Sequence, residues 1–183
     1  MTFLLLFLAL GARAETSCLA RVAEEITSLR AAFPRLAGHN LVLETFDSGD
    51  SFFMARPRYA WRAPKDRIYA VFVNKKLCQD PPPPDAEKAI LAHELAHIEA
   101  YTEMGRMDLL GLGWAYAARP GGKTVEAFEK AADDAAVKRG FAEGLARYRE
   151  WLYLHVSPAA AARKKIIYRT PDELRGSASM GKR

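Results

Sequence analysis

The chain has 183 residues, of which 50% are hydrophobic and 27% are charged, a balance typical of a folded domain and not of a disordered or fibrous chain. Its formal net charge of +5 is spread over interspersed basic and acidic residues, which argues against the concentrated basic surface of a nucleic-acid-binding protein. We therefore expect one globular domain without a nucleic-acid partner.

Residues 1–14 have the pattern of a secretory signal peptide. An apolar run over residues 3–10 is followed by Gly11-Ala12-Arg13-Ala14, which supplies the small residues found at signal-peptidase sites. The run is much shorter than the roughly 20 residues of a membrane-spanning helix, so cleavage after Ala14 is favoured over a retained anchor. We expect an exported protein, periplasmic or extracellular, with its domain over residues 15–172 and no stable membrane insertion.

The chain's two cysteines, Cys18 and Cys78, are predicted to form a disulfide, because disulfides persist in the compartments that exported proteins reach. The bond would join the first helix to the stretch that precedes the helix predicted over residues 86–103. Closing a loop of this length contributes roughly 4 kcal/mol in the chain-entropy model. The alternative is two buried free thiols.

The amino-terminal half predicts one helix and three strands. Apolar residues recur at helical spacing from Ser17 to Phe33, and Pro34 ends this amphipathic segment. Strands are predicted over residues 41–46, 51–55 and 68–74, of which the last is the strongest because it is apolar almost throughout. The basic and aromatic residues of 56–66 follow no period and predict a loop.

The remaining elements are mostly helical. A run of prolines precedes Asp85, which is suited to cap a helix over 86–103. Glycines between residues 105 and 122 predict a loop-rich insertion that covers one side of a cleft. Further predictions are helices over 124–139 and 141–155, a short strand over 166–168 and a flexible tail over 173–183. The expected fold is therefore α+β, mostly helical with a small antiparallel or mixed sheet.

The helix predicted over 86–103 contains His93-Glu94-Leu95-Ala96-His97, the pattern HExxH. Four residues make about one helical turn, so His93 and His97 project from the same face and can bind one metal ion, for which zinc is well suited. Glu94 lies beside that ion, where its carboxylate can accept a proton from water. The alternative is a surface helix whose histidines are four apart by coincidence.

A catalytic zinc ion usually has three protein ligands and one water molecule, so the chain must supply a third group. Glu126, Glu129 and Asp133 share one face of the helix predicted over 124–139, because the second and third follow the first by three and seven residues. Glu129 is the preferred ligand and Glu126 is its rival. The alternative for this acidic face is a solvated helix surface.

HExxH followed by Glu129-Lys130-Ala131-Ala132-Asp133, the pattern ExxAD, resembles the signature of the gluzincin metallopeptidases. The resemblance is nearest to the branch that contains the CAAX prenyl protease and the HtpX-type peptidases, and it extends from Tyr69 to Gly140. This chain is shorter than the membrane-embedded members and lacks their transmembrane helices, so the comparison is with a soluble, reduced catalytic core. It also has Glu126 where relatives often have arginine.

The resemblance implies a complete site. It would make His93, His97 and Glu129 the ligands of one Zn²⁺ ion, Glu94 the general base and Asp133 the group that orients the ring of His93. It would also make the strand over 68–74 an edge strand, in a zincin-like sheet, against which an extended peptide substrate pairs.

A developing oxyanion needs a hydrogen-bond donor besides the metal. The candidates are Tyr116, Tyr153, His155 and Tyr168. His155 ranks first, because it and His39 are the two histidines outside HExxH and His39 lies in a predicted turn.

These observations predict an exported zinc-dependent metalloendopeptidase that hydrolyses a peptide or protein substrate, with Glu94 and His155 as its catalytic residues. A second hypothesis is a zinc-binding protein that keeps a peptidase scaffold as a catalytically silent interaction module. A third is a metal-free helical binding module.

Overall fold

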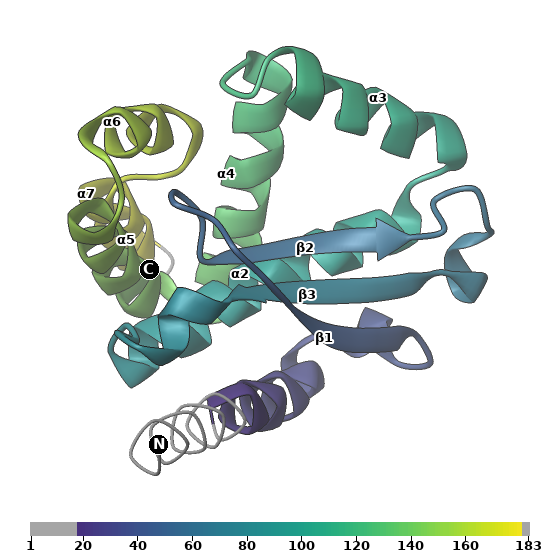
Figure 1. The fold of residues 1–183 in the computed structure, drawn as a ribbon, viewed down its shortest axis with the longest axis horizontal. Helices are drawn as coiled ribbons and strands as arrows, with labels where there is room; N and C mark the ends of the chain where they lie inside the picture. The colour runs from purple at the N-terminus through teal and green to yellow at the C-terminus, as the bar shows by residue number, and fades with distance from the viewer. Residues whose placement is uncertain (1–17, 181–183) are drawn as a thin grey trace, which may run out of the picture.

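A small mixed sheet lies at the middle of the fold (Figure 1) in the computed structural model, which describes residues 18–180. Its strands are β1 (Asn40–Phe46), β2 (Phe53–Arg58) and β3 (Ile68–Asn74), in the order β1-β3-β2. β3 runs parallel to β1 and antiparallel to β2. The predicted α+β class with a small mixed sheet is confirmed.

β3 is the central strand because its side chains are apolar on both faces of the sheet. The consecutive residues Tyr69, Ala70 and Val71 point to alternate faces and are at most 1% exposed. The resemblance to gluzincins predicted that this strand lies at the edge, and that prediction is wrong, since β3 pairs with a strand on each side. The edge beside the HExxH helix is instead β2, which has β3 as its one strand partner in the described sheet.

Helices pack against one face of the sheet and lie beside it (Figure 1). Those that follow β3 are α2 (Pro84–Glu103), α3 (Arg106–Ala118), α4 (Lys123–Lys138), α5 (Ala142–His155), α6 (Pro158–Ile167) and α7 (Pro171–Met180). α2 lies across one face of the sheet, α3 arches away from it, and α5, α6 and α7 gather at one end, while a helix over 18–29 lies on the β1 side (Figure 1). No helix within residues 18–180 is long and apolar enough to span a membrane.

α2, which carries HExxH, is fixed at both ends. A proline occupies its first turn, where the missing N–H costs no hydrogen bond, and Pro83 is the N-cap in place of the predicted Asp85. At the other end the buried guanidinium of Arg67 donates to the carbonyls of Tyr101 and Met104, at 3.1 and 2.8 Å. The last carbonyls of a helix have no partner within it, so Arg67 both satisfies them and ties the start of β3 to the end of α2.

The stretch 105–122, for which glycines predict a loop, forms helix α3 instead. Gly111 and Gly113 sit in the helix with open space around their Cα atoms. Each glycine costs the helix about 1 kcal/mol relative to alanine, and burial of Leu109 and Leu112 compensates for that cost. The prediction that this stretch covers one side of a cleft is confirmed.

Two predictions near the carboxyl terminus are also corrected. The short strand expected over 166–168 is the end of α6, because Ser157 caps a helix that continues to Ile167. The tail expected over 173–183 is helical as far as Met180, since Leu174 is fully buried in the core and anchors α7. Residues 181–183 and the predicted signal peptide, 1–14, lie outside the described residues.

The disulfide between Cys18 and Cys78 is confirmed, with Cα atoms 5.6 Å apart. It joins the helix over 18–29 to the short 3-10 helix Lys75–Cys78 that follows β3. The two cysteines are 60 residues apart, so the bond removes substantial loop-closure entropy from the unfolded chain.

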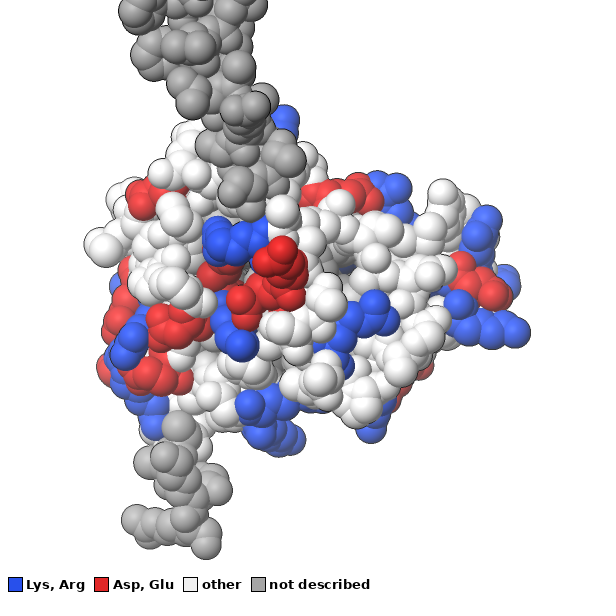
Figure 2. Space-filling view, turned by 90° about the horizontal axis from the view of Figure 1, so that it is seen from below, with Lys and Arg blue, Asp and Glu red and all other residues white. Residues whose placement is uncertain are grey.

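Acidic and basic side chains lie next to one another on the face seen from below (Figure 2). Ion pairs also link the helix over 18–29 to α2: Arg21 pairs with Glu87, and Lys88 lies 3.3 Å from Glu25. Glu87 is buried, so its pairing with Arg21 offsets part of the cost of removing a carboxylate from water. The mixture of signs on this face agrees with the absence of a concentrated basic patch there.

A side chain added at Gly144 should destabilise the protein, because α5 crosses the start of α2 at this residue. A Cβ there would lie 2.5 Å from the carbonyl oxygen of Asp85 and 2.7 Å from Cβ of Ala89. We expect Gly144→Ala to lower the free energy of unfolding by about 2–3 kcal/mol, measured by urea denaturation.

Gly113→Ala is the matched control, because it also replaces a helical glycine but has nothing within 4 Å of the added Cβ. It should leave stability unchanged or raise it by up to about 1 kcal/mol. Equal stability of Gly144→Ala and the unsubstituted protein would contradict the close approach of α2 and α5.

Candidate metal centre

Three potential metal ligands from two helices meet at one point. α2 provides Nε2 of His93 and of His97, and α4 provides Oε2 of Glu129. The two imidazole nitrogens are 3.0 Å apart, and Glu129 Oε2 lies 3.3 Å from His93 Nε2 and 2.9 Å from His97 Nε2. All three residues are buried. The three ligands predicted from the sequence are therefore brought together.

This spacing fits a metal site. Ligand atoms of a tetrahedral zinc ion, each about 2.0–2.1 Å from the metal, are roughly 3.3–3.4 Å apart. The triangle formed by His93, His97 and Glu129 is only slightly smaller, so one ion can contact all three atoms after small side-chain movements. The cluster can hold a metal ion.

Small residues allow the two ligand-bearing helices to pack closely. Ala92 and Ala96 on α2 and Ala132 and Ala136 on α4 are all buried. With methyl groups in place of longer side chains, the helix axes can approach to the short end of the usual range of about 8–10 Å. The alanine-rich sequence around both motifs thus lets a carboxylate on α4 reach the imidazoles on α2.

Asp133, one turn beyond Glu129, fixes the ring of His93. Oδ1 of Asp133 lies 2.8 Å from Nδ1 of His93, which directs the opposite ring nitrogen toward the other two ligands. The same oxygen accepts a hydrogen bond from the buried Arg149 at 2.8 Å, and Oδ2 accepts one from the backbone N–H of Arg169 at 2.9 Å. Burial opposes ionisation of Asp133, but Arg149 and His93 outweigh it and lower the pKa of this carboxyl.

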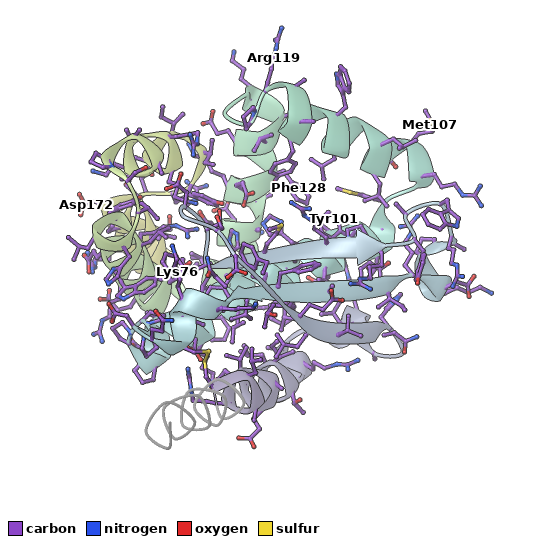
Figure 3. All side chains as sticks on the ribbon, in the orientation of Figure 1. Lys76, Tyr101, Met107, Arg119, Phe128 and Asp172 are labelled. Carbon is purple, nitrogen blue, oxygen red and sulfur yellow. A yellow bond between two sulfur atoms is a disulfide. The ribbon has the colours of Figure 1, made fainter. Side chains whose placement is uncertain are left out.

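The other two ligands are held by aromatic side chains. The hydroxyl of Tyr116 on α3 donates to Oε1 of Glu129, so Oε2 remains directed at the imidazoles. The ring of Phe128 stacks on His97 with centroids 4.7 Å apart. Phe128 and Tyr101 lie on the inner side of α3 (Figure 3). Three helices therefore determine where the ligand atoms lie.

Glu94 lies at the surface of the cleft beside these ligands and is itself buried. Its Oε2 has no hydrogen-bond partner among the described residues, although an unpaired buried carboxylate is costly. Burial raises the pKa of Glu94, and the opposing effect of His93 and His97 is smaller. A carboxylate at the cleft with a raised pKa and one unpartnered oxygen can accept a proton.

A cleft of about 630 Å³ leads to the cluster. Its polar lining residues are Ser51, Arg56, Glu94, His97, Tyr101, Tyr116, Glu129 and Tyr168. The rest of the lining comes from β2, the loop after it and α3, through Phe53, Met54, Ala55, Pro57, Ala60, Leu109, Leu112, Gly113 and Ala117. A molecule bound in this cleft would contact both the potential metal ligands and the edge strand β2.

Two other predicted site residues lie elsewhere. Glu126 is part-exposed and pairs with Lys130 at 2.8 Å, so Glu129 and not Glu126 joins the two histidines. His155 is not among the residues that line the cleft. Its Nδ1 lies 2.6 Å from the carbonyl oxygen of Trp151 and its Nε2 lies 2.9 Å from Asp80, so the structure does not bring it to the ligand cluster. Among the four candidate donors, Tyr116 and Tyr168 line the cleft.

Arg149 is the residue that the sequence analysis missed. It is fully buried, pairs with Asp133 and stacks its guanidinium 4.1 Å from the ring centroid of Tyr168. A signal was present in the sequence, because Arg149 lies on the apolar stripe of α5 between Leu145 and Leu152. Arginine is rarely buried without a partner, so its place in that stripe predicts a buried carboxylate elsewhere in the fold.

Comparison with protein-family models, curated proteins and solved structures found no match to this chain. The interpretation of the site therefore depends on its own geometry.

Glu129→Gln should abolish stoichiometric metal binding, because it removes the anionic ligand while preserving side-chain size. We expect the metal content of the purified protein, measured by inductively coupled plasma mass spectrometry, to fall at least about tenfold. Glu126→Gln is the matched control, since Glu126 is on the same helix and outside the cluster. Loss of metal in Glu126→Gln, with retention in Glu129→Gln, would reverse the assignment.

The stability of the metal-free protein should fall as the pH rises from 6.5 to about 9. Burial alone would lower the pKa of His93, but Asp133 and Glu129 raise it from 6.5 to about 9. The pKa of His93 is 6.5 in the unfolded chain and about 9 in the folded protein. Protonated His93 therefore contributes its full stabilisation to the folded state below pH 6.5, and this stabilisation is lost as the pH rises through about 9. The loss should be about 3 kcal/mol, measured by urea denaturation in the presence of EDTA.

His93→Gln is the control, because it removes the titrating group. Lys164, whose pKa burial lowers to about 8, is present in both proteins and cancels in the comparison. Parallel stability profiles for the two proteins between pH 6.5 and 9 would show that His93 is not the group responsible.

Proposed function

We propose that the protein is a zinc-dependent metallopeptidase that hydrolyses peptide bonds in an exported environment. The observation that carries the proposal is Glu94, a buried carboxylate with one unpartnered oxygen, which faces the cleft beside the cluster of His93, His97 and Glu129. A metal site that is only structural is closed by its protein ligands, whereas this one has three ligands next to an open cleft. That difference favours hydrolysis over a silent scaffold.

Zinc is the metal that we assign to the cluster. Two imidazoles and one carboxylate form a donor set used by catalytic zinc in peptidases. When bound, zinc supplies a Lewis acid that polarises the substrate carbonyl and lowers the pKa of water. Softer thiolate ligands are absent from the cluster, and both cysteines are engaged in the disulfide.

Glu94 transfers the proton in the proposed reaction. As the oxygen of water bonds to the carbonyl carbon of the substrate, the carboxylate of Glu94 accepts a proton from that water. The same proton passes from Glu94 to the peptide nitrogen as the carbon–nitrogen bond breaks. The raised pKa of Glu94 suits both halves of this cycle, because the protonated form is then less costly to reach.

Tyr168 replaces His155 as the proposed donor to the developing oxyanion. Tyr168 lines the cleft, and its ring centroid lies 5.9 Å from that of His93. Burial and Glu129 raise the pKa of its phenol well above the ordinary value, so the hydroxyl stays protonated and can donate. Tyr116 also lines the cleft, but its hydroxyl is engaged by Glu129.

The edge strand β2 is the proposed binding site for substrate backbone. It borders the cleft, and β3 occupies only one of its two sides. An extended peptide can add to such an edge through main-chain hydrogen bonds, which suits a peptide or protein substrate. We assign to β2 the role that the sequence analysis gave to the strand over 68–74.

Export of the protein to the periplasm or the extracellular space forms part of the proposal. The disulfide between Cys18 and Cys78 supports it, because such bonds persist in oxidising compartments. The predicted signal peptide over 1–14 supports it independently.

Glu94→Gln tests the proposed activity. It removes the proton acceptor while keeping the three ligands, so hydrolysis of a quenched-fluorescent peptide library should fall by about two to four orders of magnitude with zinc still bound at one equivalent. Glu126→Gln, outside the cleft, should retain full activity. Undiminished cleavage by Glu94→Gln, or no EDTA-sensitive cleavage by the unsubstituted protein, would contradict the proposal.

A further inference from the structure

Helix α3 carries apolar side chains on two opposite faces. Its inner face lines the cleft with Leu109, Leu112 and Tyr116. Its outer face carries Met107, Leu110 and Trp114, which are 77%, 63% and 74% exposed. These three residues are three and four positions apart, so they form one continuous stripe along the helix, here called the outer stripe. A stripe of large apolar side chains left in water indicates a binding surface.

The charges around the outer stripe are basic. Arg106 and Arg119 flank α3, and Lys123 follows at the start of α4. None of these three side chains has a hydrogen bond or an ion pair within the described part of the chain, unlike Arg139, Arg169 and Arg175, which all pair with carboxylates. The acidic residue between them, Asp108, accepts a hydrogen bond from the N–H of Gly105 at the helix start. Met107 and Arg119 both lie on the outer side of the arch (Figure 3).

A second exposed element borders the same cleft. In the loop after β2, Trp61 is 64% exposed, and its ring centroid lies 5.4 Å from that of Tyr59. The guanidinium of Arg62 lies 4.5 Å from the ring centroid of Tyr59. Ala60 in this loop and Leu109 on α3 line the cleft together, so the two elements are neighbours. Aromatic and basic side chains are therefore also exposed on the loop that borders the cleft.

We propose that the outer stripe of α3 binds the surface of an anionic lipid bilayer. Tryptophan, leucine and methionine on one helix face enter the boundary between headgroups and acyl chains, and arginine and lysine at the ends of the helix pair with lipid phosphates. α3 is too short to cross the bilayer, so it lies in the plane of the surface. Binding through this face leaves the inner face of α3 directed at the cleft.

A second copy of the chain is a poorer occupant of this surface. Two outer stripes packed antiparallel would place Arg106 of one copy beside Arg119 of the other, with no acidic group free to separate them. Like charges that meet in an interface oppose association. An anionic bilayer instead offers negative charge along the whole length of the helix.

Vesicle flotation tests the proposal on the exported form, residues 15–183, so that the apolar leader does not itself bind lipid. With vesicles of phosphatidylcholine containing about 30% phosphatidylglycerol, we expect the protein to float, and with phosphatidylcholine alone we expect binding to be weaker by about tenfold. Replacing Met107, Leu110 and Trp114 together by serine should reduce binding to the anionic vesicles at least about tenfold.

The matched control replaces Leu154 and Ile166 by serine. These residues are 83% and 59% exposed on other helices, so their loss also removes exposed apolar side chains, but away from α3, and should leave binding unchanged. Circular dichroism checks that both variants remain folded. The proposal is overturned if the unsubstituted protein does not float with anionic vesicles, or if the two variants bind equally. It is also overturned if sedimentation velocity shows a dimer that the outer-stripe variant loses, because the occupant is then a second copy.

Discussion

The structure depends on one buried chain of charged groups, Arg149–Asp133–His93, which passes from α5 through α4 to α2. Its charges are removed from water, so each must be paired, and the ion pair between Arg149 and Asp133 provides that pairing at 2.8 Å. Asp133 then orients His93, and this brings the imidazole toward His97 and Glu129. The same contacts that join three helices therefore also place the ligand atoms.

A site built in this way is held by packed helices and borders a cleft. α2 is fixed by prolines at its start and by Arg67 at its end, and the close contact at Gly144 sets its position against α5. The less buried elements, β2 and α3, form the walls of the cleft. This division, with the potential metal ligands on packed helices and the cleft walls on an edge strand and an exposed helix, is the arrangement expected of a preorganised site.

Local patterns predicted most of the fold and the ligands themselves. Helical spacing placed His93 and His97 on one face and left Glu126 and Glu129 as rivals, between which the resemblance to ExxAD favoured Glu129. β3 could be identified because it is apolar almost throughout. The position of β3 between its neighbours could not be predicted, since the lateral order of strands depends on contacts distant in sequence. α3 was not predicted because its glycines disfavour a helix in isolation. Burial of Leu109 and Leu112, which favours the helix, depends on tertiary contacts. Which carboxylate Arg149 pairs with, and which of the four candidate donors lie at the cleft, depended on tertiary packing that the sequence does not encode locally.

We propose that His93, His97 and Glu129 bind one zinc ion with a position left for water. Zinc K-edge X-ray absorption of the purified protein distinguishes this site from the alternatives. We expect four light-atom neighbours at about 2.0–2.1 Å, two of them imidazole nitrogens identified by their multiple scattering. A sulfur neighbour, a shell of six oxygens, or protein that binds no zinc would contradict it.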